Sequence, residues 1–166
     1  EQRTRLTDEE VIARCPWATT GRTHHRTPNI ITSLELDPAE MEKRNIHLQK
    51  KYAEIEENEV RFEELHCEDA EYLIVAFGSC ARIAQKAMEM AREEGIKVGL
   101  LRPITLWPFP SKAIAARAAQ VKGILTVELN AGQMVEDVRL AVECKVPVEH
   151  FGRLGGIVPD PDEVIT

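Results

Sequence analysis

Apolar runs alternate with helical patterns over the second half of the chain. The run Tyr72–Phe77 contains no polar residue, which predicts a strand covered on both faces. A helix is expected over 80–94, closed by Gly95 at the position after its last turn, and a second strand over 96–101. The pattern continues with a helix, a strand, a helix and a strand, over 111–121, 124–129, 132–144 and 146–151, and finishes in loop. Strands alternating with helices predict a three-layer α/β/α fold with a mainly parallel sheet.

The first half of the chain has a different pattern. Residues 1–36 contain few apolar positions apart from one short candidate strand at 30–34, and are expected to form an extended connector. Asp37 suits a helix N-cap, Pro38 the first helical position and Glu40 the third. A narrow apolar seam then predicts one long helix to about Leu65. We therefore divide the chain into the connector 1–36, a linker helix segment 37–70 and an α/β domain 71–166.

Composition narrows the class of protein. The 166 residues are 43% hydrophobic and carry a net charge of −7, which disfavours a nucleic-acid partner. Apolar runs are too short to span a membrane, and a secretory signal pattern is lacking. Four scattered cysteines in an acidic chain suit the cytoplasm. Because the first residue is Glu1 rather than Met, we expect a part of a longer protein.

The usual chemical motifs are missing from the sequence. Gly78-Ser79 follows the first strand without the further glycines of a dinucleotide fingerprint or a P-loop, so Ser79 is interpreted as a helix N-cap. Cys80 lies where a helix dipole can lower a thiol pKa, but no base accompanies it in the sequence. The cysteines form no C-x-x-C pair. The histidines lack metal-ligand spacing and are interpreted as solvated or packing residues: His24-His25, His47, His66 and His150. No catalytic, cofactor-binding or metal-binding residue is predicted.

The stretch VELNAGQM, residues 127–134, crowds polar groups into one strand-to-helix corner. Asn130 is expected to be the N-cap, Gln133 its capping-box partner, and Gly132 the residue that lets the helix start close to the strand. Glu128 is then a carboxylate on a buried strand and needs a partner, for which Arg102 is the candidate. The alternative is a ligand site at the carboxyl ends of the strands.

The loop at residues 102–110, RPITLWPFP, combines three prolines with two large aromatic residues. Proline stiffens a loop and lowers the entropy cost of docking it. Arg102, Trp107 and Phe109 are therefore candidate interface residues. The alternative is that both rings cover the core of the domain itself.

These motifs together resemble one family, the 2-oxoacid:ferredoxin oxidoreductases. The strings that carry the resemblance are YLIVAFGS (72–79), the whole stretch 81–110 ending in RPITLWPFP, GILTVELNAGQMVEDVRLAV (123–142) and FGRLGG (151–156). Upstream, PWATTG (16–21), NIITSLELDPAEMEKRN (29–45) and LQKKY (48–52) are similar to the family's connector. The part resembled is the carboxyl-terminal domain of the alpha subunit, which is like the carboxyl-terminal domain of transketolase. The type acting on 3-methyl-2-oxobutanoate is the most similar.

The resemblance implies a whole enzyme that oxidatively decarboxylates a 2-oxoacid with thiamine diphosphate, Mg²⁺, coenzyme A, iron–sulfur clusters and ferredoxin. It implies that this part assembles subunits, holds no cofactor and is inactive alone. Its partners would be the remaining alpha-subunit domains and the other subunits; a homodimer is left open. Two other hypotheses stand beside it: a regulatory module that binds a small molecule or an anion, and a stand-alone enzyme using Cys80 or Glu128.

Overall fold

A computed structural model describes residues 6–17 and 30–165. The chain divides into two units, residues 1–46 and 47–166, which are considered separately. In the first unit, the short helix α1, Asp8–Arg14, is capped by Thr7, whose hydroxyl accepts from the Glu10 N–H while the Glu10 carboxylate accepts from the Thr7 N–H. The string PWATTG and the pair His24-His25 lie wholly or mainly outside the described residues. Residues 30–37 form neither helix nor strand, so the short strand expected at 30–34 is wrong.

The long helix α2 spans Pro38–Asn58 and joins the two units in sequence. Its start is confirmed, since the Asp37 carboxylate accepts from the N–H groups of Ala39 and Glu40 at 2.8 and 3.1 Å. Its end is not: the helix stops at Asn58, and residues expected to prolong it form the strand β1, Phe62–Leu65. This strand pairs antiparallel with Leu100–Pro103, and that non-local pairing overrides the helical spacing of the sequence.

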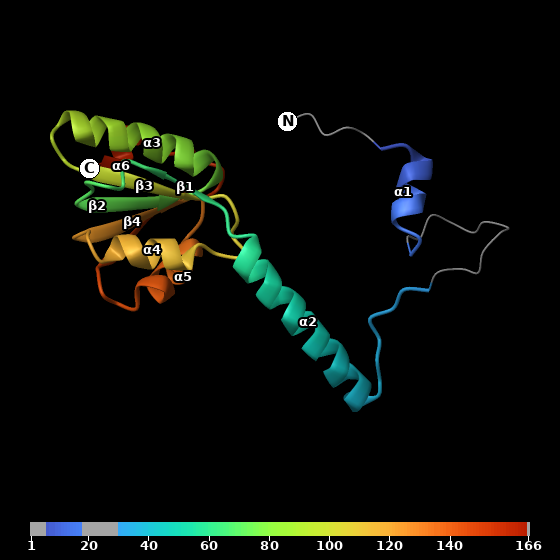
Figure 1. The fold of residues 1–166 in the computed structure, drawn as a ribbon. Helices are drawn as coiled ribbons and strands as arrows, with labels where there is room; N and C mark the ends of the chain where they lie inside the picture. Colours follow the sequence, from blue (N-terminus) through green and yellow to red (C-terminus); the bar gives the residue numbers. More distant parts are fainter. Residues whose placement is uncertain (1–5, 18–29, 166) are drawn as a thin grey trace. The chain divides into compact units, whose positions relative to one another are not determined.

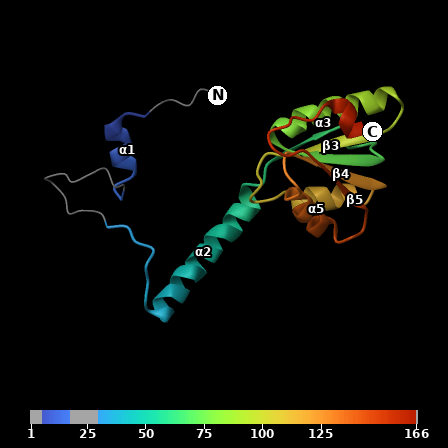
Figure 2. The same ribbon diagram turned by 180° about the vertical axis from the view of Figure 1, so that it is seen from behind.

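The second unit is a three-layer α/β/α domain built on five strands in the order β1-β3-β2-β4-β5 (Figure 1). After β1 come β2, Tyr72–Ala76, β3, Val98–Pro103, β4, Gly123–Glu128, and β5, Val148–Gly152. These four strands run parallel, and only β1 is antiparallel. The helices α3, Gly78–Glu93, and α6, Pro161–Ile165, cover one face, while α4, Ser111–Ala118, and α5, Met134–Val142, cover the other (Figures 1 and 2).

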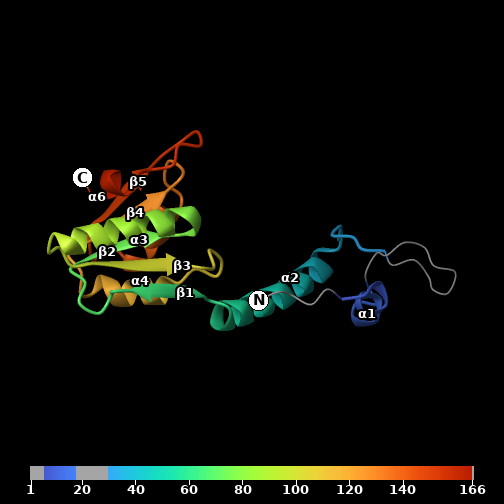
Figure 3. The same cartoon turned by 90° about the horizontal axis from the view of Figure 1, so that it is seen from above.

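The central strand β2 has buried residues on both faces, as its unbroken apolar run predicts. Leu73 and Val75 join the core under α4 and α5. Ile74 and Ala76 join the core under α3 and α6. Figure 3 shows α3 running over the middle of the sheet. Its small buried residues Ala84 and Ala87 let the helix lie close to the strands.

The two ends of α3 differ in how well the sequence predicted them. Gly95 closes α3 as expected: its φ is +87°, its N–H bonds to Arg92 O, and the Ile96 N–H bonds to Ala91 O. The N-cap of α3, however, is Phe77 rather than Ser79. Phe77 is still extended and its carbonyl already accepts from the Ala81 N–H, so the helix begins two residues earlier and Ser79 is left exposed within it.

The helix α6 replaces the loop expected at the carboxyl end of the chain. The signal was present, because Asp160-Pro161-Asp162-Glu163 has the same Asp-Pro-x-Glu order that begins α2. Here Asp160 accepts from the Asp162 N–H, and Val164 is buried against α3. The burial of Val164 thus makes the carboxyl-terminal segment part of the helical layer that contains α3.

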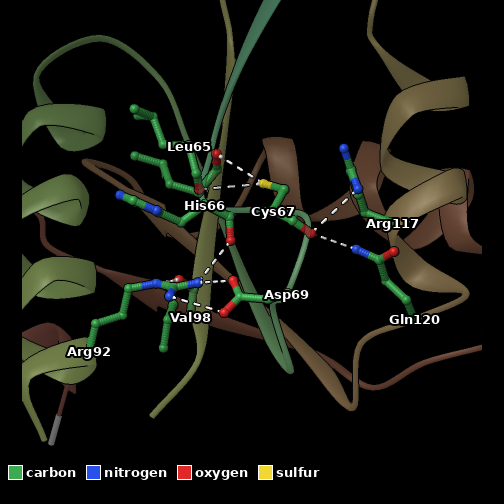
Figure 4. Close-up of polar contacts among 9 residues, drawn as sticks. Leu65, His66, Cys67, Asp69, Arg92, Val98, Arg117 and Gln120 are labelled. Atoms are coloured by element: carbon green, nitrogen blue, oxygen red, sulfur yellow. Dashed lines mark hydrogen bonds and ion pairs between the residues drawn. The ribbon is translucent and has the colours of Figure 1, made fainter. Parts of the chain in front are cut away.

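The turn between β1 and β2, residues His66–Ala70, is held from both layers of helices (Figure 4). From α3, Arg92 donates to His66 O at 3.0 Å and pairs with Asp69. From the α4 side, Arg117 makes two bonds to Glu64, and Gln120 donates to Cys67 O at 2.6 Å. Beneath the turn, a Cβ on Gly99 would lie 3.0 Å from His66 O and from the Ala70 Cβ. The edge strand β1 is therefore fixed by side chains far away in sequence.

We expect Arg117→Met to lower the free energy of unfolding of the chain by about 1–3 kcal/mol. The change keeps the apolar stem but leaves Glu64, only 22% exposed, without its cation. Urea unfolding followed by circular dichroism measures the difference. Arg82→Met, at an exposed position of α3, is the matched control and should change little. Equal stability of the two variants would show that β1 does not depend on this pair.

Candidate functional site

The carboxyl ends of β2 and β4 lie side by side in the middle of the sheet, at the point where the chain reverses its direction of winding. Ligands of open parallel sheets commonly bind in such a crevice. The corner that follows β4, Glu128–Gln133, is therefore the first place to test for a site.

Glu128 is fully buried and caps α5. One carboxylate oxygen accepts from the N–H groups of Gln133 and Met134 at 3.3 and 2.9 Å. The other accepts from the Val135 N–H at 3.0 Å. The negative charge thus lies against the positive end of the helix, where charged hydrogen bonds are strong.

Arg102, the expected partner of Glu128, is engaged elsewhere. It lies on β3, and β2 separates that strand from β4. Arg102 instead pairs across the β1–β3 ladder with Glu63 at 2.9 Å. The expectation is wrong because the sequence did not show β1, the strand that supplies the carboxylate.

Asn130 and Gln133 also differ from their expected roles. The Asn130 side chain accepts from the Gly132 N–H at 2.8 Å, which closes a local turn before the helix. The N-cap position belongs to Gln133, whose side chain makes no capping bond. Gly132 does allow the tight corner, with φ at +106° and a Cβ that would lie 3.1 Å from Val135. The capping box is thus replaced by a buried carboxylate from the preceding strand.

His150 on β5 completes the corner; the sequence indicated only a solvated or packing histidine there. Its Nδ1 lies 3.2 Å from Thr126 Oγ1 and 3.5 Å from a Glu128 oxygen. Its Nε2 is buried, and the described part of the chain provides that atom with no hydrogen bond. A Cβ on Gly152 would lie 2.6 Å from that nitrogen and 2.3 Å from Asn130 O. The backbone at Gly152 therefore packs directly against the His150 ring and the Asn130 carbonyl, and no side chain fits between them.

The chemistry of the corner follows from these contacts. A diphosphate needs free N–H groups at a helix start, but Glu128 already occupies those of α5 and would repel a second anion. The corner therefore does not fit thiamine diphosphate. Cys80, at the start of α3, is buried, and burial together with the charge of Glu128 raises the pKa of its thiol. A raised thiol pKa disfavours the nucleophilic role that a helix N-terminus can promote.

The loop after β3 forms a groove with the end of α2. We call this the Trp107 groove; it measures about 920 Å³ and is lined by Ala53, Glu56, Glu57, Val60, Phe62, Trp107, Pro108, Phe109, Pro110, Ser111, Lys112 and Ala113. Trp107 is 55% exposed and meets Tyr52 edge-on, with ring centres 5.6 Å apart. Phe109 is half-buried and packs against the core under α4 and α5.

The three candidate interface residues therefore have different environments. Trp107 is presented to solvent, Phe109 contributes to the domain's own core, and Arg102 is in an ion pair on the sheet edge. Whether the groove is an interface remains a prediction.

Residues 6–17 and 30–165 offer neither a membrane-spanning helix nor a cluster of three metal-ligating side chains. Among those residues, no helix combines the length and the apolar character needed to cross a bilayer. Within the same ranges, histidine, cysteine and acidic side chains do not gather in a group of three able to hold a metal ion.

Comparison with known proteins places the fold and the family. A split-gene transketolase in an inactive beta4 tetramer superposes with a TM-score of 0.55 at 20% identity, covering 63% of this chain and 39% of that one, which shows the fold. A 2-oxoglutarate:ferredoxin oxidoreductase from Magnetococcus marinus, solved with 2-oxoglutarate, coenzyme A and succinyl-CoA, superposes with a TM-score of 0.67 at 26% identity. That match covers 79% of this chain and 23% of that one.

The sequence defines the family. The profile of pyruvate:ferredoxin oxidoreductase core domain II matches residues 70–164, and the chain belongs to that family. It is 48% identical over 151 residues to the ketoisovalerate oxidoreductase subunit VorB of Methanothermobacter thermautotrophicus, covering 89% of this chain. The chain spans only 42% of that relative's length.

We expect Glu128→Gln to lower the free energy of unfolding by about 1–3 kcal/mol. The amide removes the charge and leaves one acceptor oxygen for three N–H groups that the carboxylate now satisfies. Thermal and urea unfolding measure the loss. Gln133→Ala is the control and should be nearly neutral, since the Gln133 side chain makes no capping bond. If Gln133→Ala costs more than Glu128→Gln, the carboxylate is not the cap.

We expect Trp107→Ala and Phe109→Ala to separate stability from association. Phe109→Ala should destabilise the domain by about 2–4 kcal/mol, because a half-buried ring leaves the core. Trp107→Ala should change stability by less than about 1 kcal/mol, since the ring is mostly exposed, while weakening any subunit contact made there. Unfolding of each single variant, beside sedimentation of the assembled subunits, distinguishes the two effects. Strong unfolding by Trp107→Ala would show that this ring supports the domain rather than a partner.

Proposed function

We propose that this chain is the carboxyl-terminal assembly domain of the alpha subunit of a 2-oxoacid:ferredoxin oxidoreductase. The whole enzyme would oxidatively decarboxylate 3-methyl-2-oxobutanoate to its acyl-CoA and pass the electrons to ferredoxin. One observation carries the substrate: the 48% identity to a ketoisovalerate oxidoreductase subunit extends over nearly the whole chain.

The geometry supports an assembly role for this domain. Its carboxyl-edge corner is filled by Glu128 and His150, and the Cys80 thiol has a raised pKa. Two of its exposed large apolar side chains, Phe62 and Trp107, line the Trp107 groove. We assign thiamine diphosphate, Mg²⁺, coenzyme A and the iron–sulfur clusters to other domains and subunits, and place the assembled enzyme in the cytoplasm.

A second candidate function is small-molecule binding. An apolar cavity of about 470 Å³ lies at the opposite edge of the sheet, where β2 and β4 begin, and includes Tyr72, Lys122, Leu125 and Val164 in its lining. Its size is within the range of ligand pockets. Under this alternative, coenzyme A, thiamine diphosphate or a nucleotide should raise the melting temperature of the chain by mass action.

We expect the isolated chain to be inactive and the complete enzyme to be active. Acyl-CoA formation and reduction of ferredoxin are measured with 3-methyl-2-oxobutanoate, 2-oxoglutarate and pyruvate in turn. The branched substrate should give the highest kcat/KM with the assembled subunits. Turnover by the isolated chain with added cofactors would overturn the assembly role, and a preference for another 2-oxoacid would overturn the substrate.

A further inference from the structure

The loop of the Trp107 groove is held by hydrogen bonds, although it carries no regular secondary structure between β3 and α4. The N–H groups of Ile104 and Thr105 donate to Arg61 O at 2.9 and 3.1 Å. In return, the Arg61 N–H donates to the Thr105 hydroxyl at 3.0 Å, and that hydroxyl donates to Pro108 O at 2.8 Å. The loop is thus fixed to the segment that leaves α2.

This fixed loop keeps large apolar side chains in solvent. Trp107 and Phe62, which line the groove, are 55% and 39% exposed. Ile104 and Leu106 of the same loop, outside the groove lining, are 50% and 47% exposed. Burying such a surface is favourable, and holding it in one conformation beforehand reduces the entropy lost on binding. The combination is typical of a surface that receives a protein partner.

The charges of the groove indicate what the partner carries. Glu56 and Glu57, from the last turn of α2, line one wall and are exposed. Two arginines of the adjoining segments are already in ion pairs within the domain: Arg61 pairs with Glu59 at 3.1 Å and Arg102 with Glu63 at 2.9 Å. Lys112 is the cation of the lining, and it comes from the start of α4 rather than from the wall of α2.

A guanidinium matches this pair of features better than other groups do. It lies flat on an indole ring and at the same time donates to carboxylates in a planar, two-pronged geometry. Trp107 supplies the ring, with more than half of its surface in solvent, and Glu56 and Glu57 supply the carboxylates.

We propose that the Trp107 groove binds a segment of another subunit of the oxidoreductase, in which an arginine is flanked by apolar residues. The guanidinium lies against Trp107 and pairs with Glu56 and Glu57, while the apolar neighbours cover the exposed ring of Phe62. The inference rests on the proposed function, because it requires this chain to be part of a multi-subunit enzyme.

The first experiment measures association between the intact alpha subunit and its partner subunits at low and high salt. Glu56→Arg with Glu57→Arg should raise the dissociation constant about tenfold or more. Glu56→Gln with Glu57→Gln should have a smaller effect and should flatten the salt dependence. The control is Glu42→Arg with Glu54→Arg, which makes the same change of net charge on α2 outside the groove. Equal weakening by the control pair would overturn the charge contact.

The second experiment tests the ring. Trp107→Phe keeps an aromatic face and should retain most of the affinity, whereas Trp107→Leu keeps apolar area but no face and should weaken association several-fold. Melting temperatures of the free subunit serve as the control for folding. Loss of affinity that is equal in the two variants would exclude stacking of a cation.

A third experiment identifies the occupant. A photoreactive benzoylphenylalanine at Ser111, an exposed residue of the groove lining, is activated in the assembled enzyme. Mass spectrometry should find a cross-linked peptide of another subunit that contains arginine next to apolar residues. A peptide from residues 1–36 of this chain, a peptide from a second copy, or no cross-link would overturn the proposal.

The two proposals fail in different ways. If the wild-type complex assembles but oxidises no 2-oxoacid, the proposed function is wrong. If the wild-type complex is active and the charge-reversal and ring variants associate as tightly as it does, only the assignment of the groove is wrong.

Discussion

A parallel sheet covered on both faces has to end its strands inside the protein, where the N–H groups of the next helix lose contact with water. Unpaired groups of this kind are costly, so each corner needs an acceptor. At the end of β4 the acceptor is the carboxylate of Glu128, which takes the first N–H groups of α5. His150 lies 3.5 Å from the same carboxylate, and Gly152 leaves the space that the His150 ring needs.

The opposite side of the sheet depends on a different set of charges. The antiparallel strand β1 is joined to the parallel sheet only through β3, and its two glutamates reach Arg102 and Arg117. Arg92 and Gln120 hold the turn that follows (Figure 4). The backbone of Arg61, just before β1, also bonds to the loop of Trp107, so hydrogen bonds connect the edge strand to the proposed docking surface.

The sequence predicted the features that depend on neighbouring residues. The apolar run of β2, the Asp37 cap and the Gly95 stop each require only a few adjacent positions, and each is confirmed. Residues 62–65, FEEL, contain no alternation that marks a strand, so β1 arises only from its pairing with β3. The cap of α5 was assigned to Asn130 because local capping is the common solution, whereas the structure uses a residue from the preceding strand. Contacts of this kind become visible only when the order of the strands is known.

Glu128 has a consequence for the protein around this domain. A helix start at the carboxyl edge of a parallel sheet normally offers a positive field to any nearby phosphate. Here the domain carries its own counter-ion, permanently bound and shielded from solvent. The start of α5 is therefore already neutralised, and a larger protein that contains this domain can hold a diphosphate on another domain without this helix competing for it.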